Sequence, residues 1–210
     1  MTEANGLTVG FVPGVTLTKW RRIWAERYPR HRLEVVEIGQ TAVLSALDQG
    51  RLDMCFARLP LDRDRLQVIP LYSEVPVVVV RKDHPIAAYD EIRLTDLADE
   101  SAIDADDPHA VDLVAGGAGV LQVPQSIARS HSRRDLVYRP ISDGTPTQVG
   151  LAWLGSNPSE LIEDFIGVVR GRTVNSSRSR PKPDQPAKIE PTKAQPTRRP
   201  GPKRRQRRRP

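Results

Sequence analysis

The sequence predicts an α/β fold in which helices with one apolar face cover a sheet, and three observations lead to this prediction. Apolar β-type runs alternate along the chain with stretches that repeat apolar residues every three or four positions. Turn-forming residues, beginning with Pro13 and Gly14, separate the two kinds of segment. Two strand–helix units follow in tandem within residues 7–57, which favours parallel strands joined by right-handed crossovers.

The first half of the chain contains both units. Strands are expected over 7–12, 33–38 and 52–57. The intervening helix, closed by Pro29, carries its apolar face on Leu17, Trp20, Ile23, Trp24 and Tyr28. We interpret the two tryptophans as packing on the sheet rather than stacking on a ligand. A second helix is expected to start at Gln40 or Thr41 and to end near Gly50, which suits a C-terminal cap.

The second half continues the alternation. Two strands are expected between Leu66 and Lys82, broken or edged by Pro70 and Pro76, and a helical turn follows over 94–98. Further strands are expected over 120–123, 136–138 and 149–154. Two helix starts carry cap signals: Asp107 before Pro108 for a helix to Ala115, and Asn157, Pro158 and Glu160 for a last helix to Val169.

Charge divides the chain into an acidic body and a basic tail. Residues 171–210 hold 14 Lys and Arg against 2 Asp and Glu, which leaves 18 basic and 24 acidic residues in 1–170. The tail also holds 8 of the 19 prolines and no aromatic residue. It therefore has too little apolar area to offset the entropy of ordering, and we expect 173–210 to be disordered.

Cys55 is the single cysteine, so no disulfide forms within the chain, and its apolar surroundings indicate a buried thiol. The first residues lack the basic and apolar segments of a signal peptide, and no apolar run reaches the ~18 residues that a membrane span needs. We therefore expect a cytoplasmic protein.

Candidate ligand contacts lie where strands end, because small molecules bind at the carboxyl ends of parallel strands and beside helix N-termini. These candidates combine hydroxyl, amide and guanidinium groups with a turn, and suit a carboxylate: Pro13, Gly14, Thr16, Thr18, Gln40, Thr41 and Arg58. The alternative interpretation is helix capping plus a surface arginine.

Other combinations predict no chemistry. The segment 116–119 (GGAG) lacks the third glycine of a dinucleotide motif and is interpreted as a turn. The acidic stretch around Asp104 and His109 suits a helix start better than a metal site. Ser126, His131 and Asp135 have the letters of a catalytic triad without a nucleophile elbow, which we attribute to chance. We expect no enzyme activity, no metal and no cofactor.

The order of motifs resembles the effector-binding domain of LysR-type transcriptional regulators. The resemblance covers roughly 5–172 and lies in 7–13 (LTVGFVP), 44–59 (LSALDQGRLDMCFARL), 77–87 (VVVVRKDHPIA) and 113–124 (LVAGGAGVLQVP). It implies a two-lobed fold of the type II periplasmic-binding-protein kind. Lobe one would comprise about 5–75 and 150–172, and lobe two about 76–149.

This resemblance implies a non-enzymatic sensor that binds a small effector, often an anionic metabolite, between the lobes, and that acts on transcription through a partner. Homodimers are common in the family; here the helix around Trp20 and Trp24 and the second strand would pair. Two departures stand out. The family's helix-turn-helix would precede the first strand, which begins about six residues after Met1, so we expect a domain without it. Only Tyr89 to His109 separates two motifs that usually stand farther apart, so we expect a shortened lobe two.

An alternative function is that of a nucleic-acid-associated accessory protein. Arginine blocks attract phosphate backbones without sequence preference and in a salt-sensitive way. The residues that would do so form the end of the tail: Arg198, Arg199, Lys203, Arg204, Arg205, Arg207, Arg208 and Arg209.

Deleting 173–210 is expected to abolish retention of the protein on heparin or DNA columns at low salt, because the remaining body carries a net negative charge. The measurement is the salt concentration of elution for both forms. Equal elution would show that the tail does not bind polyanions.

Overall fold

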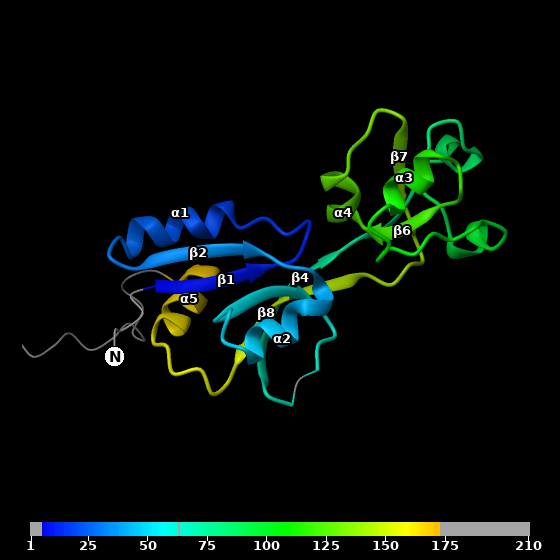
Figure 1. Ribbon diagram of the computed structural model, residues 1–210. Coiled ribbons are helices and arrows are strands. Elements are labelled where there is room, and N and C mark those ends of the chain that lie inside the picture. The colour runs from blue at the N-terminus through cyan, green and yellow to red at the C-terminus, as the bar shows by residue number, and fades with distance from the viewer. Residues whose placement is uncertain (1–5, 63, 173–210) are drawn as a thin grey trace, which may run out of the picture. The chain divides into compact units, whose positions relative to one another are not determined.

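The computed structural model describes residues 6–62 and 64–172 (Figure 1). The chain divides into two units, 1–173 and 174–210, and the described residues lie in the first. They form a five-stranded sheet of order β2-β1-β3-β8-β4 and a three-stranded sheet of order β6-β5-β7. We call the five-stranded sheet with its helices lobe one and the three-stranded sheet with its helices lobe two.

Lobe one contains β1 (Gly6–Phe11), α1 (Thr18–Arg27), β2 (Arg32–Glu37), the 3-10 turn η1 (Gln40–Ala42), α2 (Val43–Asp48), β3 (Met54–Arg58), β4 (Leu66–Glu74), β8 (Thr147–Leu154) and α5 (Leu161–Val169). Lobe two contains β5 (Pro76–Arg81), η2 (Pro85–Ala88), η3 (Leu94–Leu97), α3 (Ala110–Ala115), β6 (Leu121–Pro124), α4 (Gln125–Ser130) and β7 (Leu136–Pro140).

The tandem strand–helix units form parallel pairs, as predicted: β1 pairs in parallel with β2 and with β3. β8 then lies antiparallel between β3 and β4. β4 and β5 are separated only by Val75, so the chain passes directly from one sheet into the other. It returns through 141–146, and β8 is already in the five-stranded sheet at Thr147, three residues before the return expected at 150.

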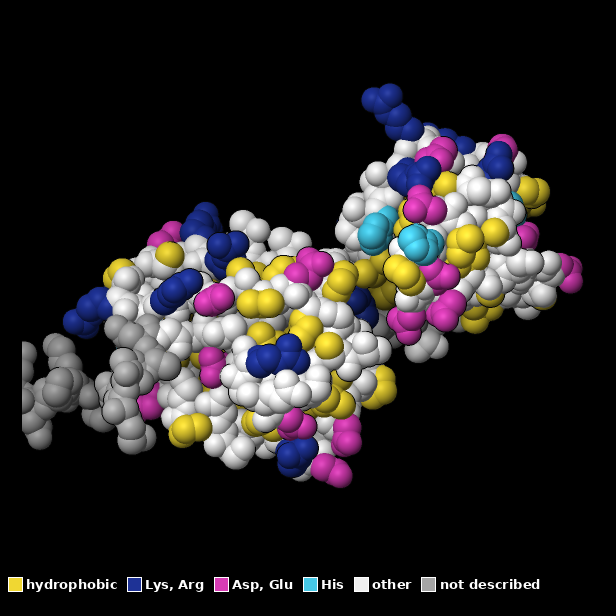
Figure 2. Space-filling view, viewed as in Figure 1, with side chains coloured by type: hydrophobic (Ala, Val, Ile, Leu, Met, Phe, Trp, Pro, Cys, Tyr) yellow, Lys and Arg dark blue, Asp and Glu magenta, His cyan; other side chains and the backbone are white. Residues whose placement is uncertain are grey.

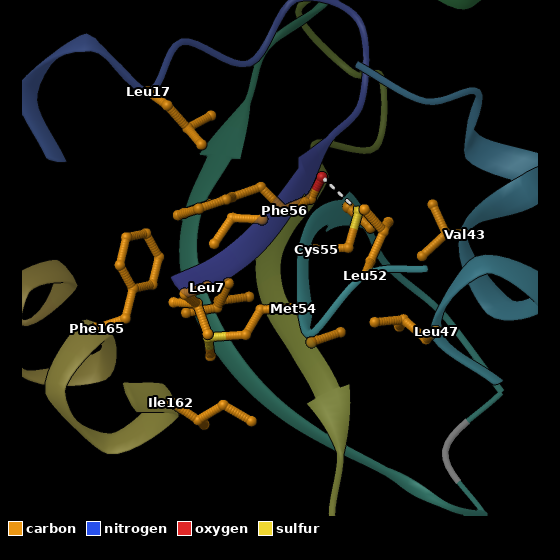
Figure 3. Packing of buried hydrophobic residues seen from close by; sticks show 14 of the residues in the cluster. Leu7, Leu17, Val43, Leu47, Leu52, Met54, Cys55, Phe56, Ile162 and Phe165 are labelled. Atoms are coloured by element: carbon orange, nitrogen blue, oxygen red, sulfur yellow. Dashed lines mark hydrogen bonds between the residues drawn. The ribbon is translucent and has the colours of Figure 1, made fainter. Parts of the chain in front are cut away.

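Helices cover both faces of the five-stranded sheet (Figure 3). Phe56 of β3 stacks on Trp20 of α1 with ring centroids 4.6 Å apart, and it meets Phe165 of α5 edge-on. On the opposite face, Cys55 lies with Leu52, Val43 and Leu47 of α2. β3 buries both of its faces because it is central and helices pack on each side.

The turn into β3 shows why its residue pattern is needed. Gly50 has a φ of 65°, a conformation that favours glycine and that ends the helix as expected. Two residues later, Leu52 is buried, and Asp53 accepts a hydrogen bond from the backbone N–H of Thr8 at 2.8 Å. Asn157 donates to the other carboxylate oxygen of Asp53 at 3.2 Å. The two hydrogen bonds that Asp53 accepts therefore hold the start of β3 beside β1 and the segment after β8.

Two helix starts were predicted wrongly. The helix expected from Asp107 begins at Ala110, because the Asp107 carboxylate accepts the His109 backbone N–H and closes a turn instead. The last helix begins at Leu161 rather than after Asn157, whose side chain accepts the Ser159 backbone N–H. In both places a side-chain oxygen satisfies a nearby N–H in a turn before the helix. The six-residue helix α4 was not predicted.

Lobe two has an apolar cluster on each face of its small sheet. The cluster of Val77, Val79, Val114, Leu121 and Leu136 packs under α3 and α4. A second cluster, with Val78, Val80, Ile86, Ile92 and Ile141, packs under the 3-10 turns. Alternate β5 residues thus face opposite clusters, and three strands suffice to bury apolar side chains on both sides.

Within 6–62 and 64–172, no helix combines the length and hydropathy of a membrane span. Over the same residues, no three His, Cys, Asp or Glu side chains are grouped so as to hold a metal ion. Asp104 and Asp107 instead accept backbone N–H groups two residues further on.

Burial raises the pKa of the Cys55 thiol to about 12, from 9.0. Below pH 9 the thiol is neutral in both the folded and the unfolded chain. Between pH 9 and 12 only the unfolded chain ionises, so the free energy of unfolding falls as the pH rises, by up to ~1.4 kcal/mol per pH unit. Urea denaturation from pH 8 to 10.5 is expected to show a steeper loss for the wild type than for Cys55→Ala. Parallel losses would contradict this.

Candidate functional site

A groove of about 580 Å³ lies between lobe-one segments and α4 of lobe two. Its walls come from the loop after β1, the end of β4 with the crossover residue Val75, and α4. The lining residues are Gly14, Val15, Thr16, Tyr72, Ser73, Glu74, Val75, Gln125, Ser126, Arg129 and Ser130. Hydroxyl groups predominate among its polar side chains, and Val15 and Val75 supply apolar area.

A buried ion pair lies beside this groove. The Arg58 Nε atom is 2.9 Å from the Glu74 Oε2 atom, and the exposed fractions of the two side chains are 13% and 4%. Among the described residues, Glu74 is the one charged residue that is buried. Because Arg58 ends β3 and Glu74 ends β4, the pair links two strands that are both neighbours of β8. Removing one partner from such a pair costs about 3–5 kcal/mol of stability, because the other charge stays buried.

Ser126 of α4 completes the polar contacts of this pair. Its hydroxyl donates to the Glu74 Oε1 atom and accepts from the Arg58 Nη2 atom at 3.1 Å. The same Nη2 atom donates to the backbone oxygen of Pro13 at 2.9 Å. The carboxylate and guanidinium therefore have partners from β3, β4, the loop after β1, and α4, which is the satisfaction that a buried pair requires.

Gly14 permits the close approach of the loop to α4. Its φ is 86°, a backbone conformation that residues other than glycine rarely adopt. A Cβ atom at this position would lie 2.6 Å from the Ser126 Oγ atom and 3.1 Å from the Ser126 backbone carbon. Glycine is therefore required here both by backbone conformation and by space.

The ion pair also affects Tyr72, which lies two residues before Glu74. Burial raises the pKa of the Tyr72 phenol, the Glu74 carboxylate raises it further, and Arg58 partly offsets these effects. The phenol is thus neutral across the physiological pH range, and it offers the groove a hydroxyl rather than a negative charge.

The structure brings part of the predicted site together. Gly14 and Thr16 line the groove, and Pro13 and Arg58 bond to each other beside it. Arg58 is not the surface arginine of the alternative interpretation, because its donors contact Glu74, Pro13 and Ser126.

The other predicted contacts lie elsewhere. The Gln40 amide bonds at both ends to the backbone of Arg58, at 2.8 and 3.0 Å, so it positions that residue. Thr18 lines a different cavity, of about 490 Å³, together with Trp24 and His31. Thr41 is exposed and does not line the groove. Ligand contact by any of the predicted residues stays a prediction.

The residues that β4 and lobe two supply to the groove were not predicted, namely Tyr72, Glu74, Gln125, Ser126, Arg129 and Ser130. One signal was present for Glu74: it is a carboxylate at the end of an apolar strand, just before the Val75-Pro76 break. Ser126 had no comparable signal, since α4 has no side-chain cap and a short apolar pattern.

The basic residues proposed for nucleic-acid contact, 198–209, lie outside the described residues, and their role stays a prediction.

The 116–119 segment forms the predicted turn between α3 and β6, with Gly117 at a φ of 80°. On the face shown in Figure 2, basic and acidic side chains are interspersed.

The family model for the LysR substrate binding domain matches residues 3–111. The chain therefore belongs to this family, whose members are effector-binding domains of transcriptional regulators. Its two sheets have the periplasmic-binding-protein-like arrangement of those domains.

Among curated proteins, the Hca operon transcriptional activator HcaR of Escherichia coli is 24% identical over 204 residues, covering 81% of this chain and 69% of that protein. A probable hydrogen peroxide-inducible genes activator of Mycobacterium avium is 30% identical over 163 residues, covering 62% of this chain and 52% of that protein.

Solved structures give the same fold. The BenM effector binding domain with its effector benzoate has a TM-score of 0.66 and 24% identity, and the match covers 79% of this chain and 90% of that one. A cysteine mutant of Corynebacterium glutamicum OxyR with hydrogen peroxide bound also has a TM-score of 0.66, with 27% identity, covering 79% of this chain and 67% of that one.

Gly14→Ala is expected to lower the free energy of unfolding by ~1–3 kcal/mol, because it combines a disfavoured φ with a clash against Ser126. Urea denaturation measures the loss. The matched control is Gly167→Ala in α5, where an added Cβ meets nothing closer than 4.0 Å, so the change should be neutral or stabilising by up to ~1 kcal/mol. Equal effects of the two substitutions would contradict the close packing of Gly14 on α4.

Proposed function

We propose that this domain senses a small anionic metabolite, most simply a carboxylate, in the groove between the β1–α1 loop, the end of β4 and α4. Occupancy of the groove would act on transcription through a partner. The observation that carries the proposal is the groove itself: in a chain of the LysR family, it joins elements of both sheets and presents hydroxyl and guanidinium donors.

The donors are suited to a carboxylate. Thr16 is exposed at the mouth of the β1–α1 loop, and Ser73 and Ser130 supply further hydroxyls. Among the described residues, the exposed Arg129 guanidinium has one long contact of 3.4 Å, from its Nε atom to the Tyr138 hydroxyl, so its other N–H groups offer a fork for two carboxylate oxygens. Val15, Tyr72 and Val75 provide the apolar area on which the remainder of a small ligand would pack.

The charge balance of the groove supports an anion rather than a cation. Glu74 is the acidic residue in the lining, and Arg58 already compensates its charge. Arg129 then leaves the lining with an uncompensated positive charge. A metabolite carrying one carboxylate would restore neutrality.

The proposed role is binding without chemistry. Several relatives are hydrogen peroxide-inducible genes activators, but thiol chemistry is a poor fit to this chain. Cys55 is its single cysteine, is fully buried in lobe one, and has a pKa raised by burial to about 12, which disfavours the reactive thiolate.

We also propose pairing of two copies through α1 and β2, since β2 is an edge strand whose Val36 is 38% exposed.

A thermal-shift screen of small organic acids, beginning with benzoate, tests the effector proposal. A ligand present at 100 times its dissociation constant adds about 2.7 kcal/mol of stability, which corresponds to a rise of about 5–10 °C in Tm for a domain of this size. Thr16→Ala and Arg129→Gln are expected to reduce that rise by removing donors from the groove.

Thr18→Ala is the matched control, because Thr18 lies on the same segment but lines the other cavity. Loss of the ligand effect in Thr18→Ala with retention in Thr16→Ala would place the ligand elsewhere. A panel of acids that leaves the Tm unchanged would contradict the proposal.

A further inference from the structure

We propose that Ser126 is a latch between the two lobes: its hydroxyl holds α4 on the buried Arg58–Glu74 pair, and an anion entering the groove releases it. The release step rests on the proposed function, because it concerns regulation of the same groove. The latch itself follows from contacts that need no ligand.

The hydrogen bonds of Ser126 run from one lobe to the other. Arg58 and Glu74 both belong to lobe one, at the ends of β3 and β4, whereas Ser126 belongs to α4 of lobe two. The Ser126 hydroxyl bonds to both charged side chains, as a donor to Glu74 and an acceptor from Arg58. Hydrogen bonds to charged groups are stronger than bonds between neutral groups, so this side chain joins the lobes through unusually favourable contacts.

Arg58, Glu74 and Ser126 differ in how easily their contacts change. The two charges are buried and depend on each other, so separating them is costly. Ser126 is half-buried and neutral. Water is able to replace its hydroxyl as a partner of both charges, and a ligand carboxylate oxygen is able to replace it as an acceptor for Arg58. The hydrogen bonds of Ser126 therefore break more easily than the ion pair, and they are the contacts of this cluster that join the two lobes.

A backbone hydrogen bond holds the start of α4. The Gln125 backbone N–H donates to the Val75 backbone oxygen at 2.9 Å, and Val75 is the single residue between β4 and β5. The start of α4 is thus tied to the crossover itself. Ser126 is the next residue. Loss of its hydrogen bonds to Glu74 and Arg58 would therefore let α4 change its angle while the helix stays packed on the three-stranded sheet.

The Ser126 hydrogen bonds lie at the groove. Glu74 and Ser126 line it, and Gly14 of its opposite wall lies against Ser126. A carboxylate held by Thr16 and Arg129 would bring negative charge beside Glu74 and compete for the Ser126 hydroxyl proton. Effector binding would thereby weaken the contact that fixes α4, and this supplies a route from occupancy to lobe movement.

The test compares Ser126→Ala with Ser130→Ala in the full chain without ligand. Ser130 lies on the same helix and lines the same groove, but its hydroxyl donates to Ile127 within α4. Amide hydrogen exchange over 12–16 and 125–130 is expected to be about tenfold faster in Ser126→Ala, as loss of a charged hydrogen bond implies, and unchanged in Ser130→Ala.

A second measurement uses spin labels on cysteines placed at the exposed Arg51 of lobe one and Arg134 of lobe two, while the buried Cys55 stays unlabelled. The label-to-label distance distribution should shift or broaden in Ser126→Ala only. Exchange rates and distances equal to those of the wild type in Ser126→Ala would overturn the latch.

Addition of benzoate at about 1 mM separates the latch from the proposed function. If benzoate raises the Tm, it should move the wild-type distances towards those of Ser126→Ala and move the variant no further. Bound benzoate that leaves the wild-type distances unchanged contradicts release. If benzoate does not bind, that part of the proposed function fails, and the ligand-free comparison alone decides the latch.

Discussion

Arg58 and Glu74 place opposite charges where water hardly reaches, and the surrounding segments are arranged to satisfy them. The ends of β3 and β4 must meet at one edge of the sheet to bring the two groups together. Gln40 fixes the Arg58 backbone, and Pro13 and Ser126 supply oxygen atoms to its guanidinium. A buried pair without these contacts would be destabilising. The pair therefore constrains the loop after β1, η1 and α4 together.

This constraint determines what the groove offers a ligand. With Glu74 neutralised by Arg58, the acidic residue in the wall does not repel an anion strongly, and Arg129 is left as the accessible cation. The phenol of Tyr72 stays neutral beside the pair. The arginine that the sequence analysis proposed as a direct contact thus supports the site from behind, while an arginine that it did not consider faces the groove.

The sequence was informative where a pattern is local. Periodicity predicted the parallel strands β1, β2 and β3 and the helix α1, whose Trp20 packs on the sheet. Turn chemistry predicted the Gly50 cap. Prediction failed where a side-chain hydrogen bond replaces the expected start of a helix, and where a distant partner decides the outcome. Helix starts at Asp107 and Asn157 shifted because side-chain oxygens bonded nearby backbone groups, and α4, which carries Ser126, had no cap or long apolar stripe. The Glu74–Ser126 contact spans 52 residues, so no spacing rule could anticipate it.

The wall of the groove that α4 forms depends on how the strands of lobe two connect to lobe one. β5, the central strand of lobe two, continues from β4 after Val75, and β6 pairs with β5 so that Pro124 lies opposite Pro76 at the crossover. α4 follows β6 at once and is held there by the bond between Gln125 and Val75. The wall therefore depends on the strands nearest the crossover.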